Sequence, residues 1–182
     1  FEFLVQGLDS DGTPQIKLLD QQLLNQQTII VEASIQSLPG VIDGSITLGD
    51  ADGDTDLDVF ISGELVNGTL ISNIFLNDGN FQFSLAQNTT FTAVSGGAAK
   101  FVDIDNDDDM DLLISGKDSG LNNVFEIHLN DGTGNYTLLD LDGVLDLSSE
   151  ILVDAIGLAD TDGDTDQDLI VTGYNTTTFS TI

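Results

Sequence analysis

The stretch Asp50-Ala-Asp52-Gly-Asp54-Thr-Asp56-Leu-Asp58-Val-Phe-Ile-Ser-Gly63 decides the fold, because an acidic nonapeptide leads directly into a short apolar run that ends in glycine. Two further stretches of the chain, 103–116 and 160–173, repeat this pattern. Carboxylates at this density repel one another unless a cation lies among them, and hard oxygen ligands suit calcium better than zinc or copper. The sequence therefore predicts about three bound calcium ions. The candidate ligands, at the odd positions of the three loops, are Asp50, Asp52, Asp54, Asp56, Asp58, Asp103, Asp105, Asp107, Asp109, Asp111, Asp160, Asp162, Asp164, Asp166 and Asp168.

The spacing separates these loops from the EF-hand, which has glycine at position 6 and a bidentate glutamate at position 12. Here position 6 is Thr or Asp, and position 12 is Ile or Val. We expect side-chain ligands at positions 1, 3, 5 and 9, and a main-chain carbonyl ligand at position 7, which is Asp56, Asp109 or Asp166. The alternative reading is three acidic, solvated turns without metal.

The acidic loops belong to a longer repeat, since Asp50, Asp103 and Asp160 lie 53 and then 57 residues apart. The run Ile74-Phe-Leu-Asn-Asp-Gly79 returns as Ile127-His-Leu-Asn-Asp-Gly132, and Asp-Gly between apolar runs predicts a tight hairpin turn. Outer strands are expected at 81–85 and 136–138, where the residues alternate or are aromatic. Each period thus predicts a strand, the acidic loop, a central strand and a two-stranded hairpin.

This arrangement resembles the FG-GAP/VCBS repeat family, the calcium-binding blades of integrin α-subunit propellers and of many secreted bacterial proteins. The resemblance rests on Asp-x-Asp-x-Asp-x-x-x-Asp followed by an apolar strand and glycine, and it covers most of the chain from Gly40 to Gly173. It implies an all-β fold of antiparallel four-stranded β-propeller-type blades, with calcium between the first two strands. The expected units are a partial blade at 1–39, blades with calcium loops at 40–93 and 94–149, and a partial blade at 150–182.

A little over three repeats, incomplete at both ends, would leave sheet faces and strand edges uncovered. Glu2-Phe-Leu-Val-Gln-Gly7 aligns with Asp58-Val-Phe-Ile-Ser-Gly63, so the chain is expected to enter at a second strand and to leave near a third. The uncovered edges could be met by further repeats of a parent chain, by copies that form a ring or filament, or by an open solenoid. In the second case, residues near Phe1–Gly7 or Tyr174–Ile182 would pair across the subunit boundary.

The charge of the chain limits its partners. With 3 Lys and Arg residues against 32 Asp and Glu residues, the formal net charge is −29. Such a surface repels nucleic acid and anionic membranes, so neither is an expected partner, and no apolar run approaches transmembrane length. The chain has no cysteine, so metal would supply part of the stabilisation. Weak, numerous calcium sites suit millimolar extracellular calcium, which predicts a secreted or cell-surface protein.

Catalysis has little support in the sequence, and no enzyme is predicted. The single histidine, His128, lies in Phe125-Glu-Ile-His-Leu129, where alternation places it opposite the apolar residues and predicts a histidine on the strand surface. There is no thiol nucleophile, and a Ser-His-Asp triad would have to use His128.

Two functional classes remain. The first is a structural or adhesive surface module in which calcium stiffens the blades. The alternative is a recognition propeller that binds a glycan or protein ligand through one loop face. Recognition surfaces favour exposed aromatic residues and Arg, and the chain has 2 Tyr, no Trp and, in Lys17, Lys100 and Lys117, only lysine as its basic residues, so the structural class is preferred.

Overall fold

A computed structural model describes residues 2–24, 27–32, 38–87, 89–141, 151–164 and 167–175. These residues form thirteen β-strands in four antiparallel sheets. Within these ranges no helix is long and apolar enough to cross a membrane. The expectation of an all-β fold with four-stranded antiparallel sheets of the β-propeller-blade type is confirmed, with four strands in two of the sheets, and the described residues form no closed barrel.

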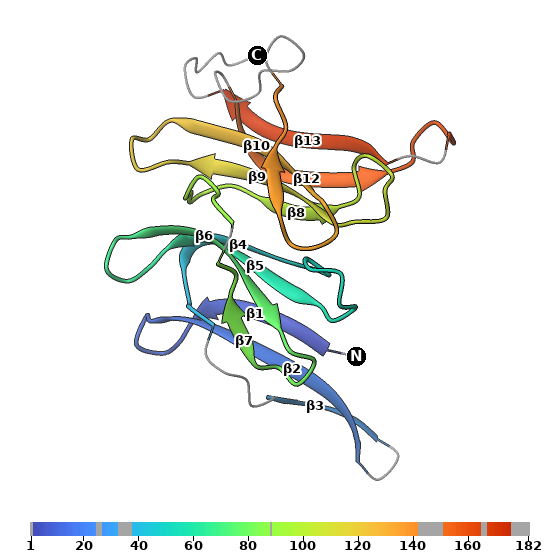
Figure 1. Ribbon diagram of the computed structural model, residues 1–182. Coiled ribbons are helices and arrows are strands. Elements are labelled where there is room, and N and C mark those ends of the chain that lie inside the picture. Colours follow the sequence, from blue (N-terminus) through green and yellow to red (C-terminus); the bar gives the residue numbers. More distant parts are fainter. Residues whose placement is uncertain are drawn as a thin grey trace.

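The four sheets follow one another along the chain and are stacked in that order (Figure 1). Sheet A contains β1 (Glu2–Leu8), β2 (Pro14–Leu24) and β3 (Gln27–Glu32). Sheet B contains β4 (Ile42–Gly49), β5 (Asp58–Glu64), β6 (Leu70–Asn77) and β7 (Phe83–Leu85). Sheet C contains β8 (Ala99–Val102), β9 (Asp111–Lys117), β10 (Asn123–Asn130) and β11 (Tyr136–Leu138), and sheet D contains β12 (Ile151–Ala159) and β13 (Asp168–Asn175).

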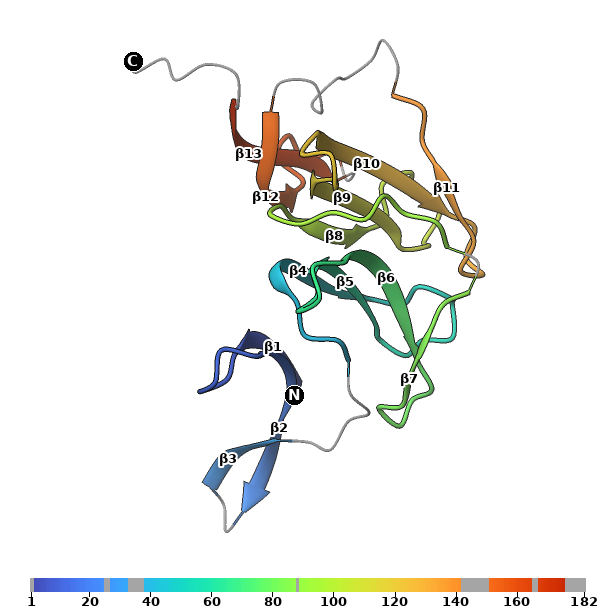
Figure 2. The same cartoon turned by 90° about the vertical axis from the view of Figure 1, so that its left-hand side faces the viewer.

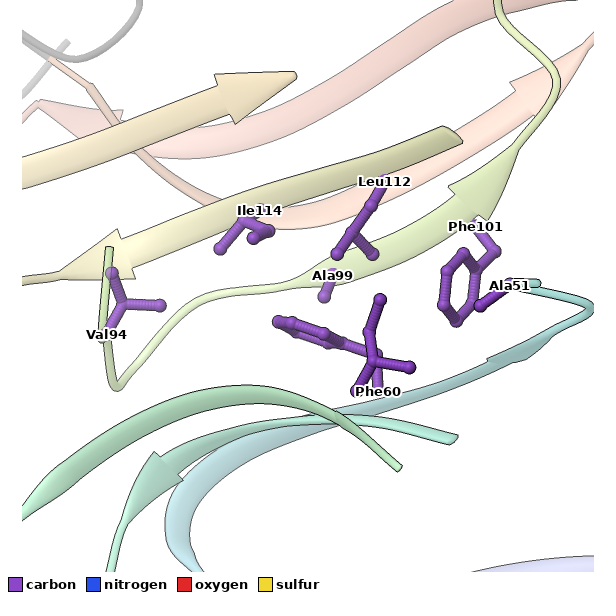
Figure 3. Close-up of a cluster of buried hydrophobic side chains, with 8 residues drawn as sticks. Ala51, Phe60, Val94, Ala99, Phe101, Leu112 and Ile114 are labelled. Carbon is purple, nitrogen blue, oxygen red and sulfur yellow. The ribbon is translucent and has the colours of Figure 1, made fainter. Parts of the chain in front are cut away.

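Sheets B and C each bury both of their faces, which explains why their second strands read as unbroken apolar runs. In β5, Val59 and Ile61 pack toward sheet A, whereas Phe60 points the other way, into the core between sheets B and C. In β9, Leu112 and Ile114 fill that same core, and Leu113 packs toward sheet D. Figure 3 shows Phe60 opposite Leu112, Ile114 and Ala99 in this core.

The segment that joins β7 to β8 runs along the edge of sheets B and C (Figure 2) and places one aromatic side chain between them. The ring of Phe91 contacts Phe60, His128 and Tyr136 edge to face, with centroids 5.8, 4.8 and 5.6 Å away. This contact corrects the prediction of a surface His128, which is buried with its Nε2 2.9 Å from Oε2 of Glu126. Alternation correctly places His128 on the face of β10 opposite Phe125 and Ile127. Sheet B and the segment between β7 and β8 cover that face, so His128 is buried as well.

The hairpins differ from the tight two-residue turn that Asp-Gly predicts. Asn77 pairs with Phe83, and Asn130 pairs with Tyr136, so residues 78–82 and 131–135 form five-residue loops. The loop is longer because the Asn77 side chain accepts hydrogen bonds from the backbone N–H groups of Gly79 and Phe81. The prediction of a hairpin is confirmed, and the predicted turn type is wrong.

The glycine that closes each second strand of sheets B and C is required by close packing. Gly63 has φ +140°, and a Cβ placed on it would lie 2.8 Å from both Cα of Gly44 and Cβ of Val41. Gly116 has φ +156° and meets Val94 and Ser95 in the same way. At the equivalent Gly7 of β1, nothing lies within 4 Å of such a Cβ.

We therefore expect Gly63→Ala to lower the free energy of unfolding by about 1–3 kcal/mol, because it combines overpacking with an unfavourable φ. The matched substitution Gly7→Ala should change it by less than about 0.5 kcal/mol, the size of an ordinary surface effect. Urea unfolding followed by circular dichroism measures both. Equal effects of the two substitutions would contradict the packing described for Gly63.

Candidate metal centre

Each acidic loop is shaped by its first aspartate. The carboxylate of Asp50 accepts hydrogen bonds from the backbone N–H groups of Gly53, Asp54 and Thr55. Gly53 and Thr55 take left-handed conformations, with φ +79° and +77°, so that their N–H groups turn inward. The second loop repeats this arrangement, since Asp103 accepts from Asp107 and Asp108. The loop thus folds around its first carboxylate.

The three loops bring the carboxylates of positions 1, 3 and 9 together. One oxygen from each member of a triad lies within 4.8 Å of the others. The triads are Asp50, Asp52 and Asp58; Asp103, Asp105 and Asp111; and Asp160, Asp162 and Asp168. Within the described residues, these three acidic triads could each hold a metal ion.

Positions 5 and 7 lie outside these triads. Asp54 and Asp107 each accept a hydrogen bond from the N–H of the residue two positions on. The side chains of Asp56 and Asp109 lie against the hairpin loop of their own sheet, at Gly79 and Gly132. Asp164 is not in the third triad, and Asp166 lies outside the described residues.

The aspartate at position 9 is also a structural link. Asp58 is fully buried, with Oδ2 accepting from Ala51 N–H at 2.8 Å and Oδ1 accepting from Asn77 N–H at 2.8 Å. Asp111 is equally buried and bonds Ile104 and Asn130 in the same way, both at 2.8 Å. One carboxylate thus joins the start of the loop to the end of the third strand.

The third loop is more open than the first two. Asp168 is half-buried and accepts hydrogen bonds from the N–H and hydroxyl groups of Thr161, which lower the pKa of Asp168. Thr161 occupies the place of Ala51 and Ile104 in the other loops. In sheet D the described strands are β12 and β13, so a third-strand contact like that of Asn77 is not part of the described structure.

Burial and mutual repulsion raise the pKa values of carboxyl groups in the first two triads, so these triads favour a bound cation. Burial raises the pKa of Asp58 to about 6, and it also raises the pKa of Asp111. Burial, followed by repulsion from Asp54, raises the pKa of Asp52, and burial and repulsion from Asp107 act likewise on the pKa of Asp105. Each of these carboxyls would release its proton more readily beside a cation.

The residues of the triads fit a hard cation. All donors are carboxylate oxygens, which is the ligand type of calcium and magnesium and not of zinc or copper. Oδ1 of Asp52 is buried and has no hydrogen-bond partner among the described residues. A buried charged oxygen without a partner is costly, and a cation at the triad would remove that cost.

Sequence reasoning missed the asparagines that hold the loops in place. Nδ2 of Asn130 donates to the carbonyls of Met110 and, across the sheet boundary, Ala51. Nδ2 of Asn77 donates to the carbonyl of Leu57. The signal is present in the sequence, because Asn precedes Asp-Gly in both periods, but the pattern by itself predicts only a turn. The first loop is therefore bonded to sheet C as well as to its own sheet.

Comparison with known proteins agrees with this geometry. Residues 50–114 match the family model described as FG-GAP-like repeat. The match begins at the first aspartate of the first loop and ends within β9, so it covers one full period and the acidic loop of the next. This stretch is similar to an FG-GAP-like repeat, which confirms the resemblance drawn from the sequence for these residues. No curated protein and no solved structure matched the chain.

The two roles of the loop aspartates can be separated by substitution in calcium-depleted buffer. Asp58→Ala leaves the buried N–H group of Ala51 and the half-buried N–H group of Asn77 unpaired, and the loss should cost about 1–3 kcal/mol of unfolding free energy for a buried group and less for a half-buried one. Asp52→Ala removes a carboxylate that its neighbours repel and whose Oδ1 is buried without a partner, at the cost of one hydrogen bond from Asp54, and it should lower the stability less than Asp58→Ala does. Chemical unfolding compares the two variants, and a greater loss from Asp52→Ala would contradict the structural role of position 9.

The raised pKa of Asp58 also sets a pH dependence for the calcium-depleted protein. An unfolded aspartyl group has a pKa of about 3.9, so the stability that protonated Asp58 contributes is present below that value and is lost as the pH rises through about 6. We expect the melting temperature to fall between pH 5 and pH 7, and to fall less in Asp58→Asn. Melting temperatures that rise over this interval in both proteins would show that Asp58 ionises without penalty.

Proposed function

We propose that the chain is an extracellular calcium-binding repeat module with a structural or adhesive role. The observation that carries the proposal is the recurrence of one acidic triad at the same loop position in sheets B, C and D. A coincidental acidic turn would not be expected to return three times with its first and ninth carboxylates within 4.8 Å of one another. Calcium is favoured over magnesium because the loops offer many oxygens on irregular backbone, whereas magnesium demands near-ideal octahedral geometry.

Calcium would act by removing repulsion at the sites that order each sheet. The triads contain the buried Asp58 and Asp111, which also bond to the third strand of their sheets. A cation at position 9 therefore stabilises the loop and the sheet together. Extracellular fluid supplies millimolar calcium, which can saturate weak sites of this kind, and this supports secretion or cell-surface display.

The outer faces of the stack favour neighbours of the same kind. Phe60 and Leu113 occupy equivalent positions that face the following sheet, and both are 0% exposed. The equivalent Ile170 of sheet D is 50% exposed, and Val5, which faces outward from sheet A, is 45% exposed. We propose that copies of the chain or further repeats of a parent chain cover these faces, as a larger propeller, a ring or a fibre would.

The second candidate is recognition of a glycan or protein ligand, and one surface feature favours it. A hollow of about 380 Å³ lies at the C-terminal ends of β5, β9 and β13. The acidic loops lie at the other ends of these strands. The hollow is lined by Lys117, Glu64 and Asp118, and by Leu121 and Tyr174, which are 75% and 53% exposed. A mixed polar and apolar hollow across three sheets suits a ligand. The FG-GAP-like repeat is typically non-enzymatic, and no catalytic role is proposed.

Calcium binding is tested by calorimetric titration of the calcium-depleted protein. We expect a stoichiometry near three, which falls by one in Asp162→Ala. At a free calcium concentration of about a hundred times Kd, each site should add about 2.7 kcal/mol to the free energy of unfolding, so the melting temperature should fall markedly on chelation. A stoichiometry of zero, or equal binding of magnesium at the same concentration, would overturn the proposal.

A further inference from the structure

Sheets A and B leave a groove between them where a strand is missing from the repeating pattern. The groove has a volume of about 810 Å³ and is lined along β1 by Leu4, Gln6 and Leu8 and along β4 by residues 42–48. Within the described residues, β1 is hydrogen-bonded to β2 alone and forms the edge of sheet A. In sheets B and C, the strand equivalent to β1 is paired on both sides.

The equivalence of β1 with the second strands of the other sheets is shown by its packing. Leu4 corresponds to Phe60 in the alignment of Gly7 with Gly63. Phe60 packs into the core toward the following sheet, and Leu4 packs against the core cluster of Val59 and Ile61 in sheet B. Sheet A therefore stacks on sheet B in the same sense as sheet B stacks on sheet C.

The strand β4 shows what the missing strand would cover. In sheet C, the equivalent strand β8 is covered by β4: the N–H groups of Ala99 and Phe101 donate to the hydroxyls of Ser45 and Thr47. As a result Phe101 is 6% exposed, whereas Leu48, at the same repeat position in β4, is 42% exposed. The greater exposure of Leu48 shows that β4 lacks the covering strand that β8 has.

The closing glycine of β1 gives a second, independent indication. Gly63 and Gly116 are packed under Val41 and Val94, which begin the segments that lead into the first strands. Gly7 has no heavy atom within 4 Å of the Cβ position. The empty space beside Gly7 is equivalent to the positions that Val41 and Val94 occupy in sheets B and C.

We propose that this groove takes up an extended polypeptide segment of the same repeat type, which pairs antiparallel with the free edge of β1 and covers β4. Its chemistry is that of residues 41–50 and 94–103: a valine for the space above Gly7, a glycine three residues later, a short strand and a terminal aspartate. The groove continues the interface by which each sheet of the stack packs on the next.

Charge agrees with this occupant. The C-terminal end of β4 lies over β8, where a Cβ on Gly49 would be 2.6 Å from the ring of Phe101. The C-terminal end of the added segment would correspondingly lie over Leu48, where Lys100 lines the groove. Every first strand of the repeat is followed directly by an aspartate, namely Asp50, Asp103 or Asp160, so the acidic end would meet this lysine.

The test uses a fluorescein-labelled peptide with the sequence of residues 94–103 and the calcium-loaded protein, with binding measured by fluorescence anisotropy. We expect saturable binding and slower amide hydrogen exchange along β1. Gly7→Val fills the space intended for the peptide valine and should weaken binding roughly tenfold or more. The control Asp11→Asn, an exposed position in the β1–β2 turn that does not line the groove, should leave binding unchanged.

Leu48→Asp, an exposed position in the groove, provides a second blocking variant if Gly7→Val does not fold, as judged by circular dichroism. The proposal is overturned if no saturable binding occurs up to about 1 mM peptide, the range of weak association. It is equally overturned if both groove variants bind normally, or if exchange slows on β13 instead of β1. The proposal depends on the stacking of the sheets and not on the identity of the cation, so its failure would leave the calcium assignment standing.

Discussion

The buried carboxylate at the ninth loop position is the interaction on which the rest of the structure depends. Asp58 and Asp111 each bond a backbone N–H at the start of the acidic loop and another at the end of the third strand. They do so while packed beside other carboxylates and out of water. A buried carboxylate beside other carboxylates is destabilising unless its charge is compensated. Hydrogen bonds and a bound cation can both provide that compensation.

This requirement connects metal binding to the stacking of the sheets. The first loop is bonded to sheet C through the Asn130 side chain, so a disordered loop would disturb the contact between sheets B and C. The same contact is filled by Phe91, Phe60 and Tyr136, with the buried His128 and the half-buried Glu126 beside them. With a formal charge of −29 and no cysteine, the chain has strong repulsion to overcome, and the proposed calcium ions would reduce that repulsion at the loops.

Much of this architecture could be predicted because local pattern and repetition agreed. The apolar runs after each acidic loop gave the second strands, and the period between Asp50 and Asp103 gave the order of the sheets. The burial of His128 could not be predicted, because the alternation of residues in β10 indicates the face on which a side chain lies but not whether another sheet covers that face. The five-residue hairpins were missed because Asp-Gly favours a tight turn, whereas the Asn77 side chain holds a longer loop. At the candidate site, spacing identified the carboxylates, but the link from Asp58 to Asn77 depends on tertiary contact across 19 residues.

The central claim is that one carboxylate couples cation binding to the order of the sheet. Residue-resolved hydrogen exchange with and without calcium tests it most directly, at the amide N–H groups of Asn77 and Asn130. Calcium should slow exchange at these two amides, and at those of Ala51 and Ile104, more than at Asp9 and Gly12 in the β1–β2 turn. Unchanged exchange at Asn77 and Asn130, while calcium binds, would contradict it.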